Sequence, residues 1–276
     1  MPDQTLHGKV AIVTGANTGI GAAIARELAS RGAIVVVNYP FPQLADQAKQ
    51  VVDSLATAST SVCIEADLST TTGPQKLVDE TVRLYGWVDI LVNNAGLAIN
   101  KPFAEQTLDD WDKLVNLNAR GVFLLTQAVL PHLPQPPSPK DTIEVPGEGE
   151  VKTERDYGRI VNIVSISARA APPLQTIYAG TKGMVDSFTR VWAKELPRKY
   201  NCTVNAVSPG PTMTEGFAAA GEEFMTAMRP VMEQTPVGDR MARPEEIAFA
   251  VGFLCEPRAS WINGLHLVAS GGLFID

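Results

Sequence analysis

Lys9-Val-Ala-Ile-Val-Thr-Gly15-Ala-Asn-Thr-Gly19-Ile-Gly21 is the segment that predicts most about the architecture of this chain. Residues 9–14 form a short apolar run, typical of a strand that is buried on both faces of a parallel sheet. Three glycines follow, and Ala22–Arg31 has a helical composition. A strand, a glycine turn and a helix in this order can hold a pyrophosphate at the helix N-terminus, because glycine lets backbone N–H groups approach the phosphates closely.

The glycine spacing is Gly-x-x-x-Gly-x-Gly, which differs from the general dinucleotide fingerprint Gly-x-Gly-x-x-Gly. A glycine turn taken alone is as often structural as functional. Because this turn lies between a buried strand and a helix, we favour nucleotide binding.

Strand-like and helix-like segments alternate through the rest of the chain. We expect further strands at Ala33–Tyr39, Ser61–Ala66, Val88–Val92, Arg159–Val164, Cys202–Val207 and Leu265–Val268. We expect further helices at 43–57, Gln75–Tyr85, Leu108–His132, around Tyr178–Lys182 and at Pro244–Cys255. This alternation predicts an α/β fold, namely a single-domain (1–276), doubly wound, Rossmann-like parallel sheet with helices on both faces. Ligands of such sheets bind at the carboxyl ends of the strands.

Two segments depart from the alternation. Pro134–Tyr157 holds five prolines and six acidic residues without an apolar period, which predicts a loop insertion (134–157). It joins a helix to the start of a strand, so we expect a surface appendage without a catalytic role. Residues 211–240 are expected to cover the substrate, since Phe217 to Gln234 is rich in methionine and phenylalanine, which suit an apolar or aromatic molecule. Packing of a helix pair against the domain explains the same residues equally well.

The end of the second strand, Asn38-Tyr39, bears on the choice of cofactor. An acidic residue there would bind the ribose 2′-hydroxyl of NAD and repel the 2′-phosphate of NADP. No acidic residue occurs until Asp46, which favours NADP. NAD stays open, because the loop contains no lysine or arginine and Thr18 occupies a position where a basic residue would help NADP.

Tyr178 and Lys182 lie four residues apart, so a helix places both side chains on one face. A neighbouring ammonium lowers the pKa of a phenol from its usual value of about 10, which makes the phenol a usable general acid or base near pH 7. Such a pair also arises by chance, and its meaning depends on the surrounding motifs. One of these motifs contains Ser165. This residue lies at the carboxyl end of a predicted strand, where its hydroxyl can point at a ligand.

Five motifs together resemble the short-chain dehydrogenase/reductase family in their order and spacing. They are Thr14-Gly15-x-x-x-Gly19-Ile20-Gly21, Asn93-Asn94-Ala95-Gly96, Ser165, Tyr178-x-x-x-Lys182 and Pro209-Gly210. The likeness covers about residues 8–133 and 158–272, and it is greatest toward reductases of the 3-oxoacyl carrier-protein and polyketide-ketone type. Val164 and Ala269-Ser270-Gly271-Gly272 depart from the family pattern without touching the catalytic motifs.

The resemblance implies a catalytic tetrad of Asn118, Ser165, Tyr178 and Lys182. Tyr178 would exchange a proton with the substrate oxygen, and Ser165 would hydrogen-bond that oxygen. Lys182 would lower the pKa of Tyr178 and bind the nicotinamide ribose, while Asn118 would hold a water in a proton relay. From the residues alone, Asn118 is as readily a surface residue.

Cofactor-binding residues follow from the resemblance together with the glycine turn and the strand ends. At the strand ends, turn chemistry alone is the common explanation. The expected cofactor contacts are Gly15, Asn17, Thr18, Gly19, Ile20, Gly21, Asn38, Tyr39, Asp67, Leu68, Asn94, Ala95, Gly96, Tyr178, Lys182, Pro209, Gly210, Thr212 and Thr214.

Composition excludes several other classes of protein. A net charge of −7 argues against a nucleic-acid or anionic membrane surface. Three scattered cysteines and three scattered histidines suggest neither a disulfide framework nor a metal site. No apolar run approaches the roughly 20 residues of a membrane span, and the first residues do not resemble a signal peptide, so we expect a cytoplasmic protein. By analogy with the family, Leu108–His132 and the Tyr178 helix are expected to pair in a homodimer or homotetramer.

The sequence therefore predicts an NADP(H)-dependent oxidoreductase that transfers a hydride between nicotinamide and a ketone or secondary alcohol. Reduction of an apolar or aromatic, polyketide-like carbonyl is the expected direction. Two alternatives stay open. One is a dinucleotide-binding regulator without turnover, against which the complete tetrad argues. The other is a redox-neutral isomerase or dehydratase on the same fold.

Overall fold

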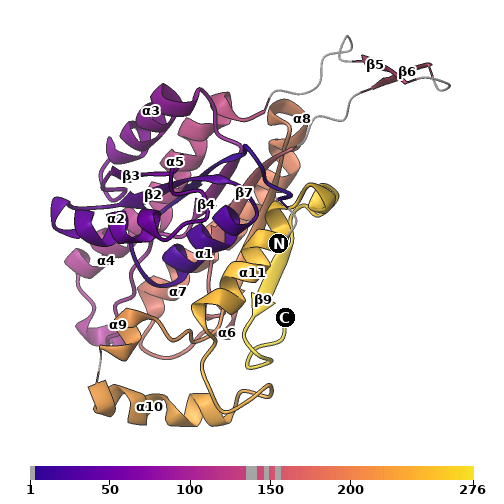
Figure 1. Cartoon of the computed structure of the whole chain (residues 1–276). Coiled ribbons are helices and arrows are strands. Elements are labelled where there is room, and N and C mark those ends of the chain that lie inside the picture. The colour runs from indigo at the N-terminus through magenta and orange to yellow at the C-terminus, as the bar shows by residue number, and fades with distance from the viewer. Residues whose placement is uncertain (1–3, 135–141, 146–148, 153–156, 220) are drawn as a thin grey trace.

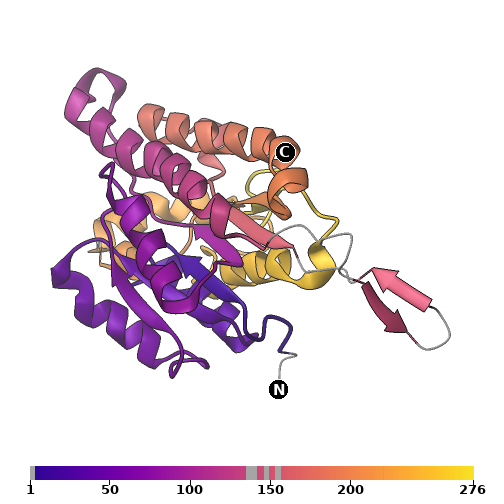
Figure 2. The same ribbon diagram turned by 90° about the horizontal axis from the view of Figure 1, so that it is seen from above.

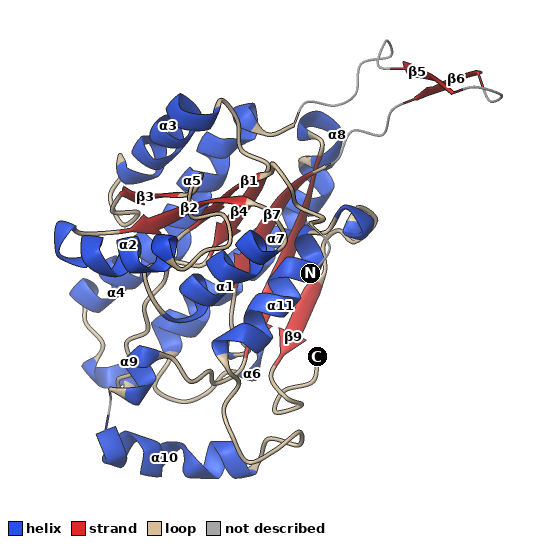
Figure 3. Cartoon of the chain, viewed as in Figure 1, coloured by secondary structure: helices blue, strands red, loops and turns tan. Residues whose placement is uncertain are grey.

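The structure, a computed structural model, describes residues 4–134, 142–145, 149–152, 157–219 and 221–276. A seven-stranded sheet has the strand order β3-β2-β1-β4-β7-β8-β9, and every neighbouring pair in it is parallel (Figures 1 and 3). The predicted doubly wound sheet is confirmed. Its strands are β1 (Val10–Val13), β2 (Ile34–Tyr39), β3 (Val62–Glu65), β4 (Ile90–Asn93), β7 (Gly158–Ile163), β8 (Cys202–Pro209) and β9 (His266–Ala269).

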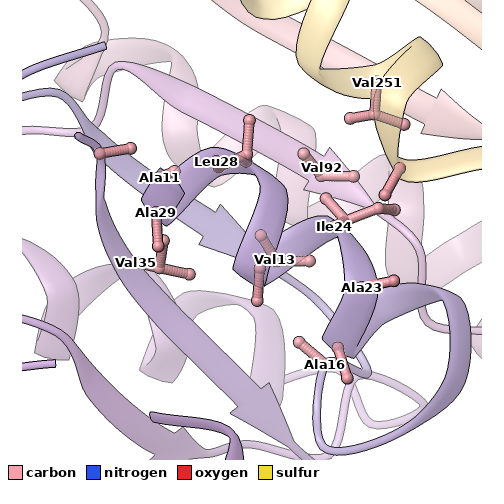
Figure 4. Packing of buried hydrophobic residues seen from close by; sticks show 14 of the residues in the cluster. Ala11, Val13, Ala16, Ala23, Ile24, Leu28, Ala29, Val35, Val92 and Val251 are labelled. Carbon is pink, nitrogen blue, oxygen red and sulfur yellow. The ribbon is translucent and has the colours of Figure 1, made fainter. Parts of the chain in front are cut away.

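Helices cover both faces of this sheet. One buried cluster joins the sheet to α1 (Gly19–Ser30), α2 (Ala45–Asp53) and α11 (Pro244–Cys255). A second cluster joins the other face to α3 (Gly73–Tyr85), α5 (Val122–Val129) and α7 (Thr176–Glu195). Figure 4 shows the first cluster, in which Val13 of β1 faces Ile24 of α1. The neighbouring Ile12 enters the second cluster, because successive side chains of a strand point to opposite faces.

Short elements complete the chain, and within the described residues no helix is long and apolar enough to cross a membrane. These elements are η1 (Pro42–Leu44), η2 (Phe103–Glu105), α4 (Leu108–Val115), η3 (Asn116–Gly121), η4 (Leu130–His132), α6 (Ser167–Ala170), α8 (Pro197–Tyr200), α9 (Glu215–Ala218), α10 (Gly221–Glu233) and η5 (Pro257–Ala259).

The predicted helix Leu108–His132 is not one continuous α-helix. A capping box between Thr107 and Asp110 begins α4, and a π-helical segment, η3, separates α4 from α5. Gly121 in η3 packs against the loop after β3, where a Cβ would lie 2.5 Å from the carbonyl oxygen of Leu68. Insertions of this kind occur often at functional sites.

The insertion 134–157 was predicted as a loop, and here the structure differs in part. β5 (Thr142–Val145) and β6 (Gly149–Lys152) pair antiparallel in a two-stranded sheet of their own, while residues 135–141, 146–148 and 153–156 lie outside the described residues. The overlooked signal is the alternation of apolar and polar residues in each strand, the pattern of a half-exposed β-strand. Figures 1 and 2 place this pair apart from the main sheet, and Figure 1 shows it at the opposite end from α10.

Candidate active site

The loops that follow β1 and β4 meet where the strand order reverses. A Cβ on Gly15, whose φ is +58°, would lie 3.0 Å from the Cα of Ala95. A Cβ on Gly21 would lie 2.3 Å from the carbonyl oxygen of Gly15. Only glycine tolerates these approaches, so the glycine turn (Gly15–Gly21) is fixed at the point of the sheet where ligands of doubly wound folds bind.

Thr14 and Asn94 hold the glycine turn in place. The Thr14 hydroxyl accepts hydrogen bonds from the backbone N–H groups of Asn94 and Ala95, each at 2.8 Å. The Asn94 amide donates to the carbonyl oxygens of Thr14 (2.7 Å) and Gly15 (3.2 Å). The side chain of Asn94 therefore supports the turn, and Thr14 is a supporting residue that the sequence analysis quoted in its motif without assigning it to the site.

The N-terminus of α1 has the features of an anion site. Thr18 precedes the helix without capping it through its side chain, and its hydroxyl instead hydrogen-bonds the carboxylate of Glu215. A Cβ on Gly19 would lie 3.3 Å from Cγ2 of Thr214, so the turn directly faces the residues after β8. The first-turn N–H groups and the helix dipole favour a phosphate here, and the residues present fit the pyrophosphate of a dinucleotide.

At the end of β2, Asn38 does not expose its side chain to a ligand. It is 1% exposed, its Oδ1 accepts from Gly15 N at 3.3 Å, and its Nδ2 donates to the carbonyl oxygens of Ile64 and Ala66. The side chain of Asn38 thus bridges the glycine turn and β3. Tyr39 lies beside Glu65 in the sheet register, and burial raises the pKa of its phenol.

Other predicted cofactor contacts also have partners within the chain. Asp67 accepts from the N–H (2.9 Å) and the hydroxyl (2.7 Å) of Ser69, which is ordinary turn chemistry. The Asn17 amide donates to Gln47 at 3.1 Å, on the surface.

The turn after β8 lies beside the same edge of the sheet. Gly210 packs on Ser270, where a Cβ would lie 3.0 Å from its Cα. Thr212 donates to the carbonyl oxygen of Gly210 at 3.0 Å, and Thr214 caps α9. The backbone N–H of Ile166 donates to the carbonyl oxygen of Pro209 at 3.1 Å, so this turn is joined to the Ser165 segment.

Ser165, Tyr178 and Lys182 come together at the carboxyl end of β7. The Ser165 hydroxyl lies close enough to the Tyr178 phenol to lower the pKa of that phenol. The Lys182 ammonium donates to the carbonyl oxygen of Ile163 at 2.8 Å and lies 5.9 Å from the centroid of the Tyr178 ring. The helical spacing that predicted a shared face for Tyr178 and Lys182 is therefore realised in α7.

The pKa of Tyr178 differs from the lowered value that we expected from the sequence. Burial raises the pKa of Tyr178, and only the hydrogen bond with Ser165 acts in the opposite direction. Burial lowers the pKa of Lys182 to about 8. The Lys182 ammonium donates its hydrogen bond to Ile163 and not to the phenol, and the net pKa of Tyr178 lies above its usual value.

Asn118 is a fully buried residue of η3, not a surface residue. Its Nδ2 donates to the Leu97 carbonyl oxygen (2.9 Å) and to Thr181 Oγ1 (3.2 Å), and its Oδ1 accepts from Leu97 N at 3.0 Å. A Cβ on Gly96 would lie 3.3 Å from Asn118 Oδ1 and 3.4 Å from Lys182 Nζ. The backbone at Gly96 therefore packs closely against the side chains of Asn118 and Lys182. No cluster of potential metal ligands occurs among the described residues.

Comparison with known proteins agrees with this geometry. The family model for short chain dehydrogenases matches residues 9–223. The chain belongs to this family. This protein is accordingly an oxidoreductase, and enzymes of the family use nicotinamide cofactors.

Individual relatives resemble this chain over nearly its whole length. Short-chain dehydrogenase/reductase FrzI of a Cladobotryum species is 37% identical, over 99% of this chain and 98% of that protein. Hydroxynaphthalene reductase-like protein Arp2 of Metarhizium robertsii is 36% identical, over 98% of this chain and 96% of that protein. Among solved structures, a blue fluorescent protein from a metagenomic library, in complex with NADPH, superposes with a TM-score of 0.84 at 32% identity. That superposition covers 98% of this chain and 100% of the other.

The buried ammonium of Lys182 predicts a particular pH dependence of stability. The pKa of Lys182 is about 8 in the folded protein and about 10.4 in an unfolded chain, so the unfolded state binds more protons between these values. Lys182 therefore contributes more to stability as the pH rises through this window. The difference in free energy of unfolding between wild type and Lys182→Met should grow by roughly 2 kcal/mol in favour of wild type from pH 7 to pH 10.

Urea unfolding at the two pH values measures this difference. Lys49→Met is the matched control, since Lys49 is exposed and Asp53 raises its pKa, so that the difference should not grow in this way. A flat difference for Lys182→Met would show that the ammonium is not desolvated.

Proposed function

We propose that this protein is an NADPH-dependent reductase of an aromatic, polyketide-like ketone. The observation that carries the proposal is the grouping of Ser165, Tyr178 and Lys182 at the sheet edge that also holds the glycine turn. The name of the relative Arp2 and the NADPH in the metagenomic protein's structure support the substrate class and the cofactor.

In this proposal the nicotinamide supplies the hydride, and the protein supplies position and proton transfer. Ser165 and Tyr178 both hydrogen-bond the substrate oxygen, which stabilises the negative charge that develops there. Tyr178 then donates its proton to that oxygen. Because burial raises the pKa of Tyr178, its phenol is protonated at neutral pH, which is the form that reduction requires.

Lys182 and Asn118 support this proton transfer. Lys182 holds a buried positive charge beside the ring of Tyr178, which favours the phenolate left after the proton is donated. Asn118 fixes the loop at Gly96 from the other side. We assign Asn118 to the proton relay on the basis of this placement.

Apolar side chains at the loops beside Tyr178 support an aromatic substrate. Lys101 N donates to the carbonyl oxygen of Leu174 at 3.0 Å, which joins the loop after β4 to the loop before Tyr178. Leu174 and Phe103 on these loops are 49% and 77% exposed. In Figure 1, α9 and α10 lie at the end of the molecule toward which β9 points, and we propose that residues 211–240 cover the substrate there.

NADPH is the proposed cofactor because the end of β2 carries no carboxylate to repel a 2′-phosphate. Paired titrations with NADPH and NADH, followed by nicotinamide fluorescence, should show tighter binding of NADPH. Tighter binding of NADH would contradict the preference and direct the search toward alcohol oxidation.

A homodimer or homotetramer is proposed from the apolar residues exposed on one side of the molecule. Trp111 of α4, Phe123 of α5 and Val191 of α7 are 50%, 42% and 54% exposed. Burial of such a surface between copies would be favourable. Light scattering at micromolar concentration should give at least twice the monomer mass, and a monomer would refute the proposal.

The proton-transfer role predicts the effect of Tyr178→Phe. The phenylalanine keeps the ring and removes the hydroxyl, so turnover should fall by about 10²–10⁴ while NADPH still binds. Tyr85→Phe is the control, because the Tyr85 hydroxyl donates only to the carbonyl oxygen of Thr60 on the surface, and it should retain wild-type turnover. The rate of NADPH oxidation with a panel of aromatic ketones measures the turnover of both variants. Near-wild-type turnover in Tyr178→Phe would refute the role, and a wild type that binds NADPH without turnover would favour the regulator.

A further inference from the structure

A group of charged side chains surrounds Asp186, one helical turn beyond Lys182 on α7. We call Arg169, Asp186, Arg190, His266 and Asp276 the charge cluster. Asp186 is 3% exposed and accepts from Arg169 Nη2 at 3.0 Å and 3.2 Å and from Arg169 Nε at 3.2 Å. His266 Nδ1 lies 2.8 Å from Asp186 Oδ1, and Arg190 lies 3.3 Å from Oδ2. Burial raises the pKa of Asp186, but His266 and Arg169 outweigh it and hold that pKa below its usual value.

The charge cluster joins three separate elements. Arg169 belongs to α6, Asp186 to α7 and His266 to β9, the edge strand of the sheet. Arg169 also pairs with the carboxylate of Asp276. Arg190 differs from the others, because it lies on the same helix as Asp186 and its side chain is 59% exposed. Within the charge cluster, Arg169 and His266 are therefore the partners of Asp186 that join α7 to other elements of the fold.

Arg169 is directly connected to the turn that carries Ser165. The N–H of Ser167 donates to Ser165 Oγ at 3.1 Å, and the N–H of Ala168 donates to the Ser165 carbonyl oxygen at 3.1 Å. Arg169 N continues this turn with a bond to the Ile166 carbonyl oxygen at 3.0 Å. Arg169 and Ser165 therefore belong to one hydrogen-bonded turn.

The loop between α6 and α7 is poorly suited to hold this geometry alone. Ala171 (φ 50°) and Leu174 (φ 69°) both have left-handed backbone conformations, which are unfavourable for residues other than glycine. Pro172 and Pro173 lie between them. Such conformations persist when surrounding contacts impose them, and the Arg169–Asp186 ion pair spans this loop.

We propose that the Arg169–Asp186 ion pair positions Ser165 against the phenol of Tyr178. This inference rests on the proposed function, because it gives the ion pair a role in the same proton transfer. The ion pair touches neither substrate nor cofactor, so Arg169 and Asp186 are positioning residues. His266 orients the carboxylate of Asp186 from the opposite side, through its Nδ1 atom.

Arg169→Ala tests the proposal, with Arg190→Ala as the matched control. Both remove one guanidinium that bonds Asp186, but only Arg169 connects α6 to α7. In Arg169→Ala, kcat for ketone reduction should fall by roughly 10- to 100-fold, as expected for a small misplacement of a catalytic group. KM and NADPH affinity should stay within about two-fold of wild type, since Arg169 touches neither ligand and the misplaced Ser165 acts in the transition state. Arg190→Ala should retain wild-type kcat.

A pH profile separates positioning from general loss of stability. Ser165 lowers the pKa of Tyr178, so weakening of this interaction in Arg169→Ala should move the limb of the kcat profile that reports Tyr178, above the limb of Lys182 near pH 8, to higher pH. Asp186→Asn should move the limb in the same direction, and Arg169→Lys, which keeps a cation, should restore part of kcat. If Asp186→Asn does not fold, Arg169→Ala alone tests the positioning role. The Arg169 side chain is 24% exposed, so its truncation should leave the protein folded.

Tyr178→Phe is measured alongside these variants to distinguish two failures. If Tyr178→Phe is inactive while Arg169→Ala has wild-type kcat and pH profile, the positioning role is wrong and the proposed function stands. An equal loss of kcat in Arg190→Ala would also overturn the positioning role. If Tyr178→Phe keeps its turnover, the proposed function itself is wrong.

Discussion

The hydrogen bond from the Lys182 ammonium to the carbonyl oxygen of Ile163 is the contact on which the site depends. It joins α7 to the carboxyl end of β7 and buries a charge whose pKa falls to about 8 as a result. Because Lys182 is fixed there, Tyr178 one turn earlier lies beside Ser165, and Asp186 one turn later lies within reach of Arg169. A single buried cation thus orders the proposed proton donor and the charge cluster along one helix.

The glycine turn, which forms the other part of the site, is held in place at the ends of two neighbouring strands. Thr14 and Asn94 join the ends of β1 and β4, and the glycines of the turn pass too close to neighbouring backbone for any side chain. The N-terminus of α1 is left facing Thr214 rather than a capping side chain. The loop after β4 also carries Gly96, where a Cβ would lie 3.3 Å from Asn118 Oδ1 and 3.4 Å from Lys182 Nζ.

The sequence was informative where one local pattern requires one structure. The glycine turn, the alternation of strands and helices and the spacing of Tyr178 and Lys182 all predicted their elements correctly. The sequence was less informative where contacts between distant segments determine burial, helix type or pKa. The burial of Asn38 and Asn118, the π-helical segment and the raised pKa of Tyr178 depend on partners far along the chain. Arg169 and His266 carry no local motif, since Asp186 joins them only after α6, α7 and β9 have assembled.

In the proposed reaction the protein moves a hydride to a ketone while Tyr178 supplies the proton. The most direct test is incubation of wild type with NADPH deuterated at the transferable C4 position and an aromatic ketone, followed by mass spectrometry of the product. The account predicts an alcohol that carries one deuterium, formed in proportion to the NADP released. A product formed without deuterium and without oxidation of the cofactor would contradict the account and indicate a redox-neutral isomerase or dehydratase.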